Sequence, residues 1–353
     1  MIIYYSTNQN LYKTYITFNS NTDLIFVIPK EAIIIKKIIV SIFVLALILS
    51  AMPTFSSAEK IKVICTTTTM KYFVQEVGGN RVDAIALVQP GICPDHFDVR
   101  PSVVSEINNA SMVVYHGIEP WLEDLINASE NKNVKKLLLN GPWGTPELAK
   151  GKINSIKDAL IEIDPKNKSF YEKNAADISK ELDALNQEIK AKATELQTSQ
   201  YKAIVMAWQK PFSEWMGLQV VQVYQPPETL SAQDVENLVK KGKDEGVTFV
   251  IDNLQSGTTL GGQMAEEIGG RHIVFSNFPE AIPGTDTISE MIQYNANELF
   301  NSIEEVQTES KEIAELKSEI SSLSNRLVIF QGLSIVFLII SIALGAMIYK
   351  RKD

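Results

Sequence analysis

The chain has 353 residues, a formal net charge of −9, and 45% hydrophobic against 21% charged residues. This mixture is typical of globular proteins, and the length allows two domains of ordinary size. An acidic chain lacks the basic surface that nucleic acid requires, so we expect no nucleic-acid partner.

The first predicted element is an export signal. A pair of lysines and an apolar run occupy residues 36–52, and the small residues Ser56 and Ala58 follow at the spacing that signal peptidase prefers. We therefore predict a leader and signal peptide over residues 1–58, with the mature chain beginning near Glu59. No Cys follows the apolar run directly, so the sequence has no lipoprotein signature. The stretch before the lysines is long for a signal peptide, which leaves the true start codon open.

Two sets of four strands are predicted next, in an N-terminal lobe over residues 59–150 and a C-terminal lobe over residues 200–300. Short β-branched runs alternate with helical stretches in both, which is typical of parallel sheets with helices on both faces. We expect an α/β fold of two lobes, each a mainly parallel four-stranded sheet flanked by helices. The expected strands are 61–66, 83–88, 112–116, 136–140, 202–207, 219–224, 247–252 and 272–276.

One long helix is predicted to link the lobes, within residues 151–199. Its apolar positions recur at spacings of 4, 3 and 4, at Ile178, Leu182, Leu185 and Ile189. This spacing predicts a single buried stripe, and Asp164-Pro165 is a suitable helix start. A helix of this length can run along both lobes and limit how far they open.

The C-terminal end predicts a helical stalk over residues 301–326 and a transmembrane helix over residues 327–349. The stalk keeps a 3-4-3-4 apolar rhythm at Ile313, Leu316, Ile320, Leu323 and Leu327. This is a short coiled-coil pattern, and a solvated stalk and a dimer seam both fit it. The next segment is uncharged and long enough to cross a hydrocarbon core of about 30 Å. The basic tail, residues 350–353, predicts a single-pass cell-membrane protein with an extracytoplasmic body and a cytoplasmic C-terminus.

Candidate metal ligands gather at one edge of the first predicted sheet. Cys93 and His96 stand three residues apart in a loop that follows a strand, and His116 ends the next strand. Carboxyl ends of parallel strands share one edge, where α/β folds bind ligands. Cys and His suit zinc or another late divalent metal. The sequence therefore predicts a divalent-metal site in the N-terminal lobe.

The same region resembles a family of solute receptors. HFDVRPS and NNASMVVYHGIEPWLEDL are similar to the N-terminal lobe of the TroA-like zinc/manganese solute-binding proteins of ABC transporters, whose motif is H-x-[YF]-x-x-x-P-S. DPKNKSFYEKNAADISKELDALNQEIKAK resembles their linking helix, and PPETLSAQDVENLVKKGKDEGVTFVID resembles their second lobe. The resemblance covers roughly residues 60–298. It implies a receptor, not an enzyme, that captures zinc or manganese between its lobes and delivers it to a membrane permease.

The sequence departs from this family at most ligand positions. His96 matches the first ligand, but Gly141 stands where the second His is expected, and Asn277 stands at the acidic fourth position. The third ligand falls at one of three residues, Met206, Trp208 or Gln209.

Two interpretations stay open. In the first, the site is rebuilt: Cys93 and His116 join His96, and Asp252 from the second lobe completes a zinc or manganese site. In the second, the receptor binds a metal chelate or a small organic solute, with tryptophans as the walls of the site. The candidate walls are Trp121, Trp143, Trp208 and Trp215.

The two cysteines leave a further alternative open. Cys65 ends the first predicted strand, and outside the cytoplasm it could form a disulfide with Cys93, which would exclude Cys93 as a ligand. A bridge, a ligand and two free thiols all remain open.

A thiolate–imidazolium pair of Cys93 and His96 is the best enzyme hypothesis, and a surface adhesin or scaffold is a third class. Because the surrounding resemblance belongs to binding proteins, we expect no enzyme.

Overall fold

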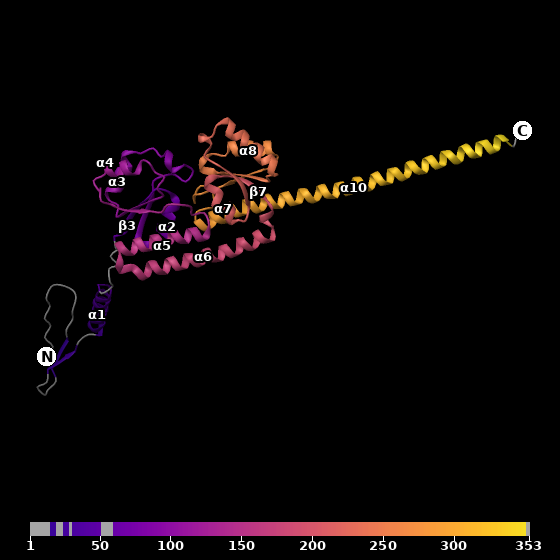
Figure 1. The fold of residues 1–353 in the computed structure, drawn as a ribbon. Helices are drawn as coiled ribbons and strands as arrows, with labels where there is room; N and C mark the ends of the chain where they lie inside the picture. The colour runs from indigo at the N-terminus through magenta and orange to yellow at the C-terminus, as the bar shows by residue number, and fades with distance from the viewer. Residues whose placement is uncertain (1–14, 19–23, 28–29, 51–58, 351–353) are drawn as a thin grey trace. The chain divides into compact units, whose positions relative to one another are not determined.

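The computed structural model describes the chain except for residues 1–14, 19–23, 28–29, 51–58 and 351–353 (Figure 1). It divides into two compact units, Met1–Ala58 and Glu59–Asp353. In the first unit, β1 (Tyr15–Phe18) and β2 (Leu24–Val27) pair antiparallel, and α1 (Lys30–Ser50) follows. The predicted signal-peptidase site at Ser56 and Ala58 lies outside the described residues.

Two parallel four-stranded sheets form the second unit, with strand orders β4-β3-β5-β6 and β10-β9-β7-β8 (Figure 1). All eight predicted strands are present within two residues of their expected bounds, so the predicted α/β fold is confirmed. The strands are β3 (Ile61–Cys65), β4 (Val82–Ala86), β5 (Met112–Tyr115), β6 (Lys135–Leu138), β7 (Lys202–Met206), β8 (Gln219–Tyr224), β9 (Phe249–Asn253) and β10 (Arg271–Phe275).

Helices cover both faces of each sheet, which explains why a strand such as β9 is buried along its whole length. Local sequence sets their ends. Ser231 and Asp234 form a capping box at the start of α8, and Gly269 adopts the left-handed conformation that ends α9. The lobe helices are α2 (Thr68–Gly78), α3 (Pro101–Asn108), α4 (Leu122–Ala128), α7 (Lys210–Trp215), α8 (Ala232–Glu245) and α9 (Thr259–Ile268).

The connection between the lobes consists of two helices, α5 (Pro146–Ile163) and α6 (Lys168–Glu195), where the sequence predicted one. Asp164 ends α5, and its carboxylate accepts hydrogen bonds from Asn167 at 2.6 Å and from the Tyr171 hydroxyl at 2.7 Å. These bonds stabilise the turn, so the second helix begins four residues later than the Asp164-Pro165 start predicted.

The buried stripe of α6 packs along both lobes. Near its start, Asn174 donates a hydrogen bond of 3.0 Å to the Val77 carbonyl of α2 in the first lobe. Near its end, Asn186 accepts one of 3.1 Å from the Trp215 indole of the second lobe. The stripe belongs to one hydrophobic core that continues from Val63 in the first lobe to Ile303 behind the second. The helix is therefore a shared support for both lobes.

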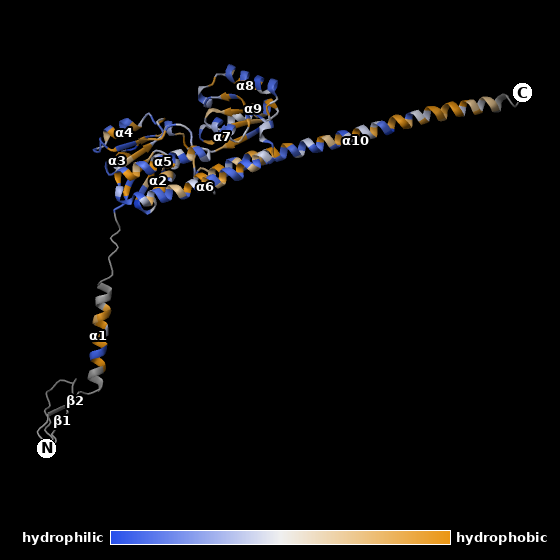
Figure 2. Cartoon of the chain, turned by 60° about the horizontal axis from the view of Figure 1, so that its bottom comes forward, coloured by the Kyte–Doolittle hydropathy of each residue, from blue (hydrophilic) through white to orange (hydrophobic). Residues whose placement is uncertain are grey.

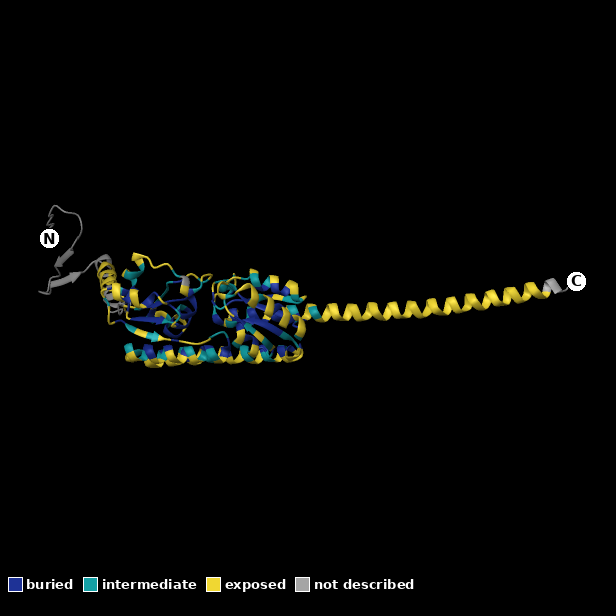
Figure 3. Cartoon of the chain, turned by 45° about the horizontal axis from the view of Figure 1, so that its top comes forward, coloured by how far each residue is buried: buried dark blue, intermediate teal, exposed yellow. Residues whose placement is uncertain are grey.

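The last helix, α10 (Ile288–Lys350), begins in the core of the second lobe and continues without a break into the predicted stalk and span. Its exposed part starts after Val306 (Figure 3). Its distal part is strongly hydrophobic (Figure 2). Among the described residues, one helix, Ile288–Met347, is long and apolar enough to cross a membrane.

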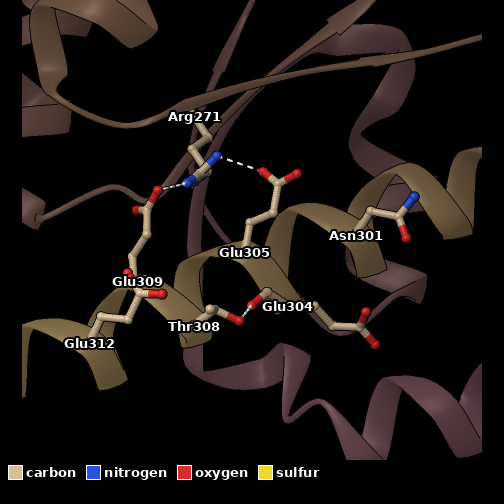
Figure 4. Close-up of a pocket in the computed structure, with 7 residues that line it drawn as sticks. All are labelled: Arg271, Asn301, Glu304, Glu305, Thr308, Glu309 and Glu312. Atoms are coloured by element: carbon tan, nitrogen blue, oxygen red, sulfur yellow. Dashed lines mark hydrogen bonds and ion pairs between the residues drawn. The ribbon is translucent and has the colours of Figure 1, made fainter. Parts of the chain in front are cut away.

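An ion-pair clamp fixes α10 where it leaves the second lobe. The Arg271 guanidinium, at the start of β10, contacts Glu305 at 2.7 Å and also pairs with Glu309 one turn further along (Figure 4). Each pair is partly solvated, so each contributes little by itself. Together they mark the last point at which the lobe holds the helix.

We expect Gly261→Ala to destabilise the second lobe by about 1–3 kcal/mol, because overpacking a dense core forces neighbours to move. A Cβ on Gly261 would collide with the carboxylate of the fully buried Asp252. Gly262→Ala is the matched control in the same helix, since its Cβ would lie 3.4 Å from the nearest atom, on His272. Chemical unfolding measures both variants, and equal stability of the two would contradict this packing.

Candidate binding cavity between the lobes

A cavity of about 280 Å³ lies between the lobes. Segments that follow β4, β5 and β6 line it from the first lobe, and segments that follow β7, β9 and β10 line it from the second. This is the carboxyl edge of both sheets, where α/β folds bind ligands. Most of the lining is apolar or aromatic, with three side-chain amides, those of Asn253, Gln255 and Asn277.

His116, one of the predicted ligands, lines this cavity, but its ring is already engaged. The side chain is 3% exposed, and Nε2 lies 2.8 Å from the Thr67 hydroxyl. The ring stacks on Trp143 with centroids 4.1 Å apart. Nδ1 is buried and has no hydrogen-bond partner among the described residues. Binding a metal through Nε2 would therefore break the contact with Thr67, whereas Nδ1 has no hydrogen bond within the described chain to give up.

The charge state of His116 follows from its burial. Burial, and then the charge of Lys152, lower the pKa of His116 to about 3. The imidazole is therefore neutral at physiological pH, the form that metal coordination requires.

An aromatic stack crosses from one lobe to the other. Trp143 stacks on His116 of its own lobe and lies nearly parallel to the Phe278 ring of the second lobe at a centroid distance of 6.0 Å. The His116 and Phe278 rings are themselves 6.4 Å apart. The Trp143 indole donates a hydrogen bond of 2.7 Å to the Asn277 carbonyl. The wall of the cavity is thus also a contact that holds the lobes together.

A run of four threonines, residues 66–69, extends this contact from the first lobe. Thr68 donates a hydrogen bond of 2.9 Å to the Pro279 carbonyl, and Thr69 donates one of 3.2 Å to the Asn277 carbonyl. The run directly follows β3 and begins α2, so its hydroxyls lie at the sheet edge. The sequence by itself does not reveal this role, because threonine signals neither a ligand site nor an interlobe contact.

Both cysteines are free thiols in the structure, so the Cys65–Cys93 bridge is not formed. Cys93 lines the cavity and is half-buried, whereas Cys65 is fully buried at the end of β3. Burial raises the pKa of both thiols. A metal bound by Cys93 would have to displace the thiol proton.

The loop that carries Cys93 and His96 is held by aromatic contacts. The Trp121 indole donates a hydrogen bond of 2.7 Å to the Pro94 carbonyl, and its ring lies 4.7 Å from that of Phe97. Trp121, predicted as a wall of the site, thus supports this loop. His96 lies in the short 3-10 turn Pro94–His96, but its side chain falls outside the described part of the structure.

The spacing of the motif corrects the residue assigned to its first position. In H-x-[YF]-x-x-x-P-S, the aromatic residue matches Phe97 and the final pair matches Pro101-Ser102. Counting back from either places Asp95, and not His96, at the histidine position. His96 lies one residue after the motif position, and its role as the first ligand stays a prediction. Asp95 joins Cys93 and His96 as a candidate ligand on this loop.

Asp252, the ligand predicted from the second lobe, does not line the cavity. Its carboxylate is 0% exposed, accepts a hydrogen bond from Tyr224 and lies 2.6 Å from Nε2 of His272. Alternate strand residues face opposite sides of a sheet, so the next residue, Asn253, is the one that reaches the cavity. The structure therefore does not bring Asp252 together with Cys93 and His116.

An amide, Asn277, occupies the position at which the family resemblance implies an acidic ligand, and Gln209 is one of the three residues at which the third ligand falls. Gln209 donates a hydrogen bond of 3.1 Å to the side-chain oxygen of Asn277. Gln255 accepts one of 3.1 Å from the Asn277 backbone and donates one of 3.2 Å to the Pro90 carbonyl across the cleft. Among the described residues, no group of three or more His, Cys, Asp or Glu side chains could hold a metal ion.

Acidification should weaken the fold through His116. Its pKa is lowered on folding, so the unfolded chain binds the additional proton below pH of about 6.5. The contribution of His116 to the free energy of unfolding is complete above that pH. This contribution falls by at most roughly 1 kcal/mol per pH unit down to about pH 3. We expect His116→Gln to show a shallower loss of unfolding free energy between pH 6.5 and 4 than the parent protein. Identical slopes would contradict the buried neutral imidazole.

Comparison with known proteins places this fold among transport proteins. The sequence model of a family described as "Zinc-uptake complex component A periplasmic" matches residues 63–302. The manganese ABC transporter substrate-binding lipoprotein PsaA of Streptococcus pneumoniae is 30% identical over 161 residues, 38% of this chain and 52% of that protein. The iron ABC transporter substrate-binding lipoprotein MtsA of Streptococcus pyogenes serotype M1 is 28% identical over 178 residues, 43% and 57% of the two chains. The chain thus spans about half the length of the curated relatives it matches.

Solved structures share the two-lobed fold. A crystal structure of ZnuA superposes with a TM-score of 0.59 at 24% identity, covering 69% of this chain and 100% of that chain. The Mn-bound periplasmic metal-binding protein of Candidatus Liberibacter asiaticus superposes with a TM-score of 0.61 at 15% identity, with the same coverage. At these identities the likeness establishes the fold alone.

Proposed function

Because this chain belongs to the family of zinc-uptake component A proteins, we propose that it is the extracytoplasmic substrate-binding receptor of an ABC importer. The observation that carries the proposal is the cavity between its two lobes, at the carboxyl edges of both sheets. A receptor of this kind needs a cleft and no catalytic group, so we propose no enzymatic activity.

The apolar end of α10 supports a membrane location. It is a candidate span that follows the folded lobes without interruption, and the basic residues after it favour a cytoplasmic C-terminus. We propose a single-pass membrane protein that delivers its substrate to a membrane permease. A second copy of the chain, predicted from the stalk pattern, is a further proposed partner.

A divalent transition metal, zinc or manganese, is the first candidate substrate. The relatives above are named for manganese and iron transport. We propose that Cys93, Asp95 and His96 capture the ion, because these donors lie on one short loop beside the cavity. His116 could join through Nδ1, which is unpartnered in the described structure, or through Nε2 after it leaves Thr67. Asp252 could join only after it leaves its buried partners.

An uncharged organic solute or a metal chelate is the second candidate substrate. The observation in its favour is the lining of the cavity, where the rings of Trp143, Trp208 and Phe278 accompany amides. Amides donate and accept hydrogen bonds without neutralising a bare cation, and aromatic walls suit flat ligands.

Zinc or manganese at 100 times its dissociation constant should stabilise the full chain by about 2.7 kcal/mol, because ligand binding favours the native state. We expect the double variant Cys93→Ser, His96→Ala to lose this stabilisation. Cys65→Ala is the control, since that thiol is buried outside the cavity and its loss should leave the metal effect intact. Thermal unfolding with and without each metal measures all three proteins.

Other outcomes separate the two substrates from a failure of the proposal. If neither metal changes stability, native mass spectrometry of the purified chain should detect a bound small molecule that Trp143→Ala releases. That result would support the second candidate. Absence of both effects would overturn the receptor function.

A further inference from the structure

The stalk part of α10 carries an apolar stripe that no element of the described chain covers. Its residues lie outside the candidate span and are more than half exposed: Ile313 51%, Leu316 58%, Ile320 65% and Leu323 56%. Between them stand mainly Glu, Lys and Ser residues. Figure 3 shows that this segment of the helix is uniformly exposed. Leaving a regular row of large aliphatic side chains in water is unfavourable, and such a row marks an interaction surface.

The exposed stripe continues one that the protein itself buries. Leu299, Val306 and Ile313 are spaced by seven residues, and seven residues return a helix to within about 20° of the same face. Leu299 is buried in the core behind the second lobe, and Val306 packs against its edge. The clamp at Arg271 marks where the lobe ends (Figure 4). Beyond it, the same face needs a different partner.

The heptad pattern indicates what that partner is. With Ile313 at position a, Ile320 is also at a, and Leu316 and Leu323 are at d. β-branched residues at a combined with leucine at d favour a parallel two-stranded coiled coil.

The charges beside the stripe fit the same arrangement. Glu312 falls at position g and Lys317 at position e, five residues further on. In a parallel pair in register, these two positions face each other across the seam, and opposite charges there are favourable. Neither residue makes a salt bridge within the described chain, so both are available for a partner.

We propose that the stalk pairs with the stalk of a second copy of this chain, as a parallel coiled coil over residues 312–327. The proposed anchor gives an independent reason for the parallel direction, because both copies cross the membrane the same way. This second reason rests on the proposed membrane location, whereas the heptad pattern does not depend on it or on the substrate.

The membrane also explains how so short a coiled coil can be stable. Two heptads are marginal for association in water, since helices this short are weakly stable by themselves. Here the stalk helix is continuous with the lobe and with the span, so it is already formed. Two copies in one bilayer encounter each other at a high effective concentration, which converts weak pairing into stable pairing.

Disulfide cross-linking of the full chain in membrane vesicles tests the seam. Ile320→Cys places a thiol at position a, and Ser318→Cys places one at position f, on the opposite side of the helix. Both are made in a Cys93→Ala chain, since Cys65 is fully buried. We expect mild oxidation to give a covalent dimer from Ile320→Cys and at least tenfold less from Ser318→Cys. Equal yields from the two, no dimer from Ile320→Cys, or a larger assembly would overturn the proposal.

Charge reversal provides a second measurement on the same Ile320→Cys chain. Glu312→Lys and Lys317→Glu should each lower the cross-linking yield severalfold, and the double reversal should restore it. A dimer held only by the membrane spans would not respond in this way. Because these positions are exposed, the melting temperature of the lobes should stay constant. Metal binding measured on Glu312→Lys and Lys317→Glu in a chain that keeps Cys93 separates this proposal from the receptor function, since either can fail without the other.

Discussion

The packing of α6 against both lobes is the constraint on which the rest of the structure depends. Its buried stripe joins the two lobes into one hydrophobic core, so neither lobe can move far without exposing apolar surface. By fixing the distance between the lobes, α6 also determines the size of the cavity. The crossing contacts of Trp143 and Thr68 then need only to close a gap whose width is already set.

The chemistry of the cavity departs from that of a charged metal centre in a consistent direction. Where the family resemblance implies an acidic ligand, Asn277 is bonded to Gln209, and the neighbouring Gln255 bridges the cleft. Each carboxamide satisfies a partner within the protein, so the polar groups are paired before any substrate enters. Cys93 and Asp95, the thiol and the carboxylate proposed as ligands, lie together on one loop of the first lobe.

The fold could be predicted from the sequence because it depends on patterns repeated over many residues. Eight β-branched runs and the stripe of α6 each contain several apolar side chains that must face the same way. The candidate site depends on single residues, where an error of one position matters. Asp252 and Asn253 are neighbours on one strand, yet only Asn253 faces the cavity. Likewise, one step along the loop distinguishes His96 from Asp95, and no periodicity identifies Gln255, which contributes through a loop.

The unbroken course of α10 determines where such a receptor can work. No glycine or proline interrupts the helix between Thr285 and Gln331, so the second lobe and the stalk move as one rod. Leu327 lies 24 residues after Ile303, a distance of roughly 36 Å at the rise of an α-helix. In the proposed tethered protein, this rod lifts the folded body well above the bilayer. A permease whose substrate entrance lies near the lipid surface would then be reached only when the helix tilts toward the membrane. Helix tilt would therefore be the step that permits delivery.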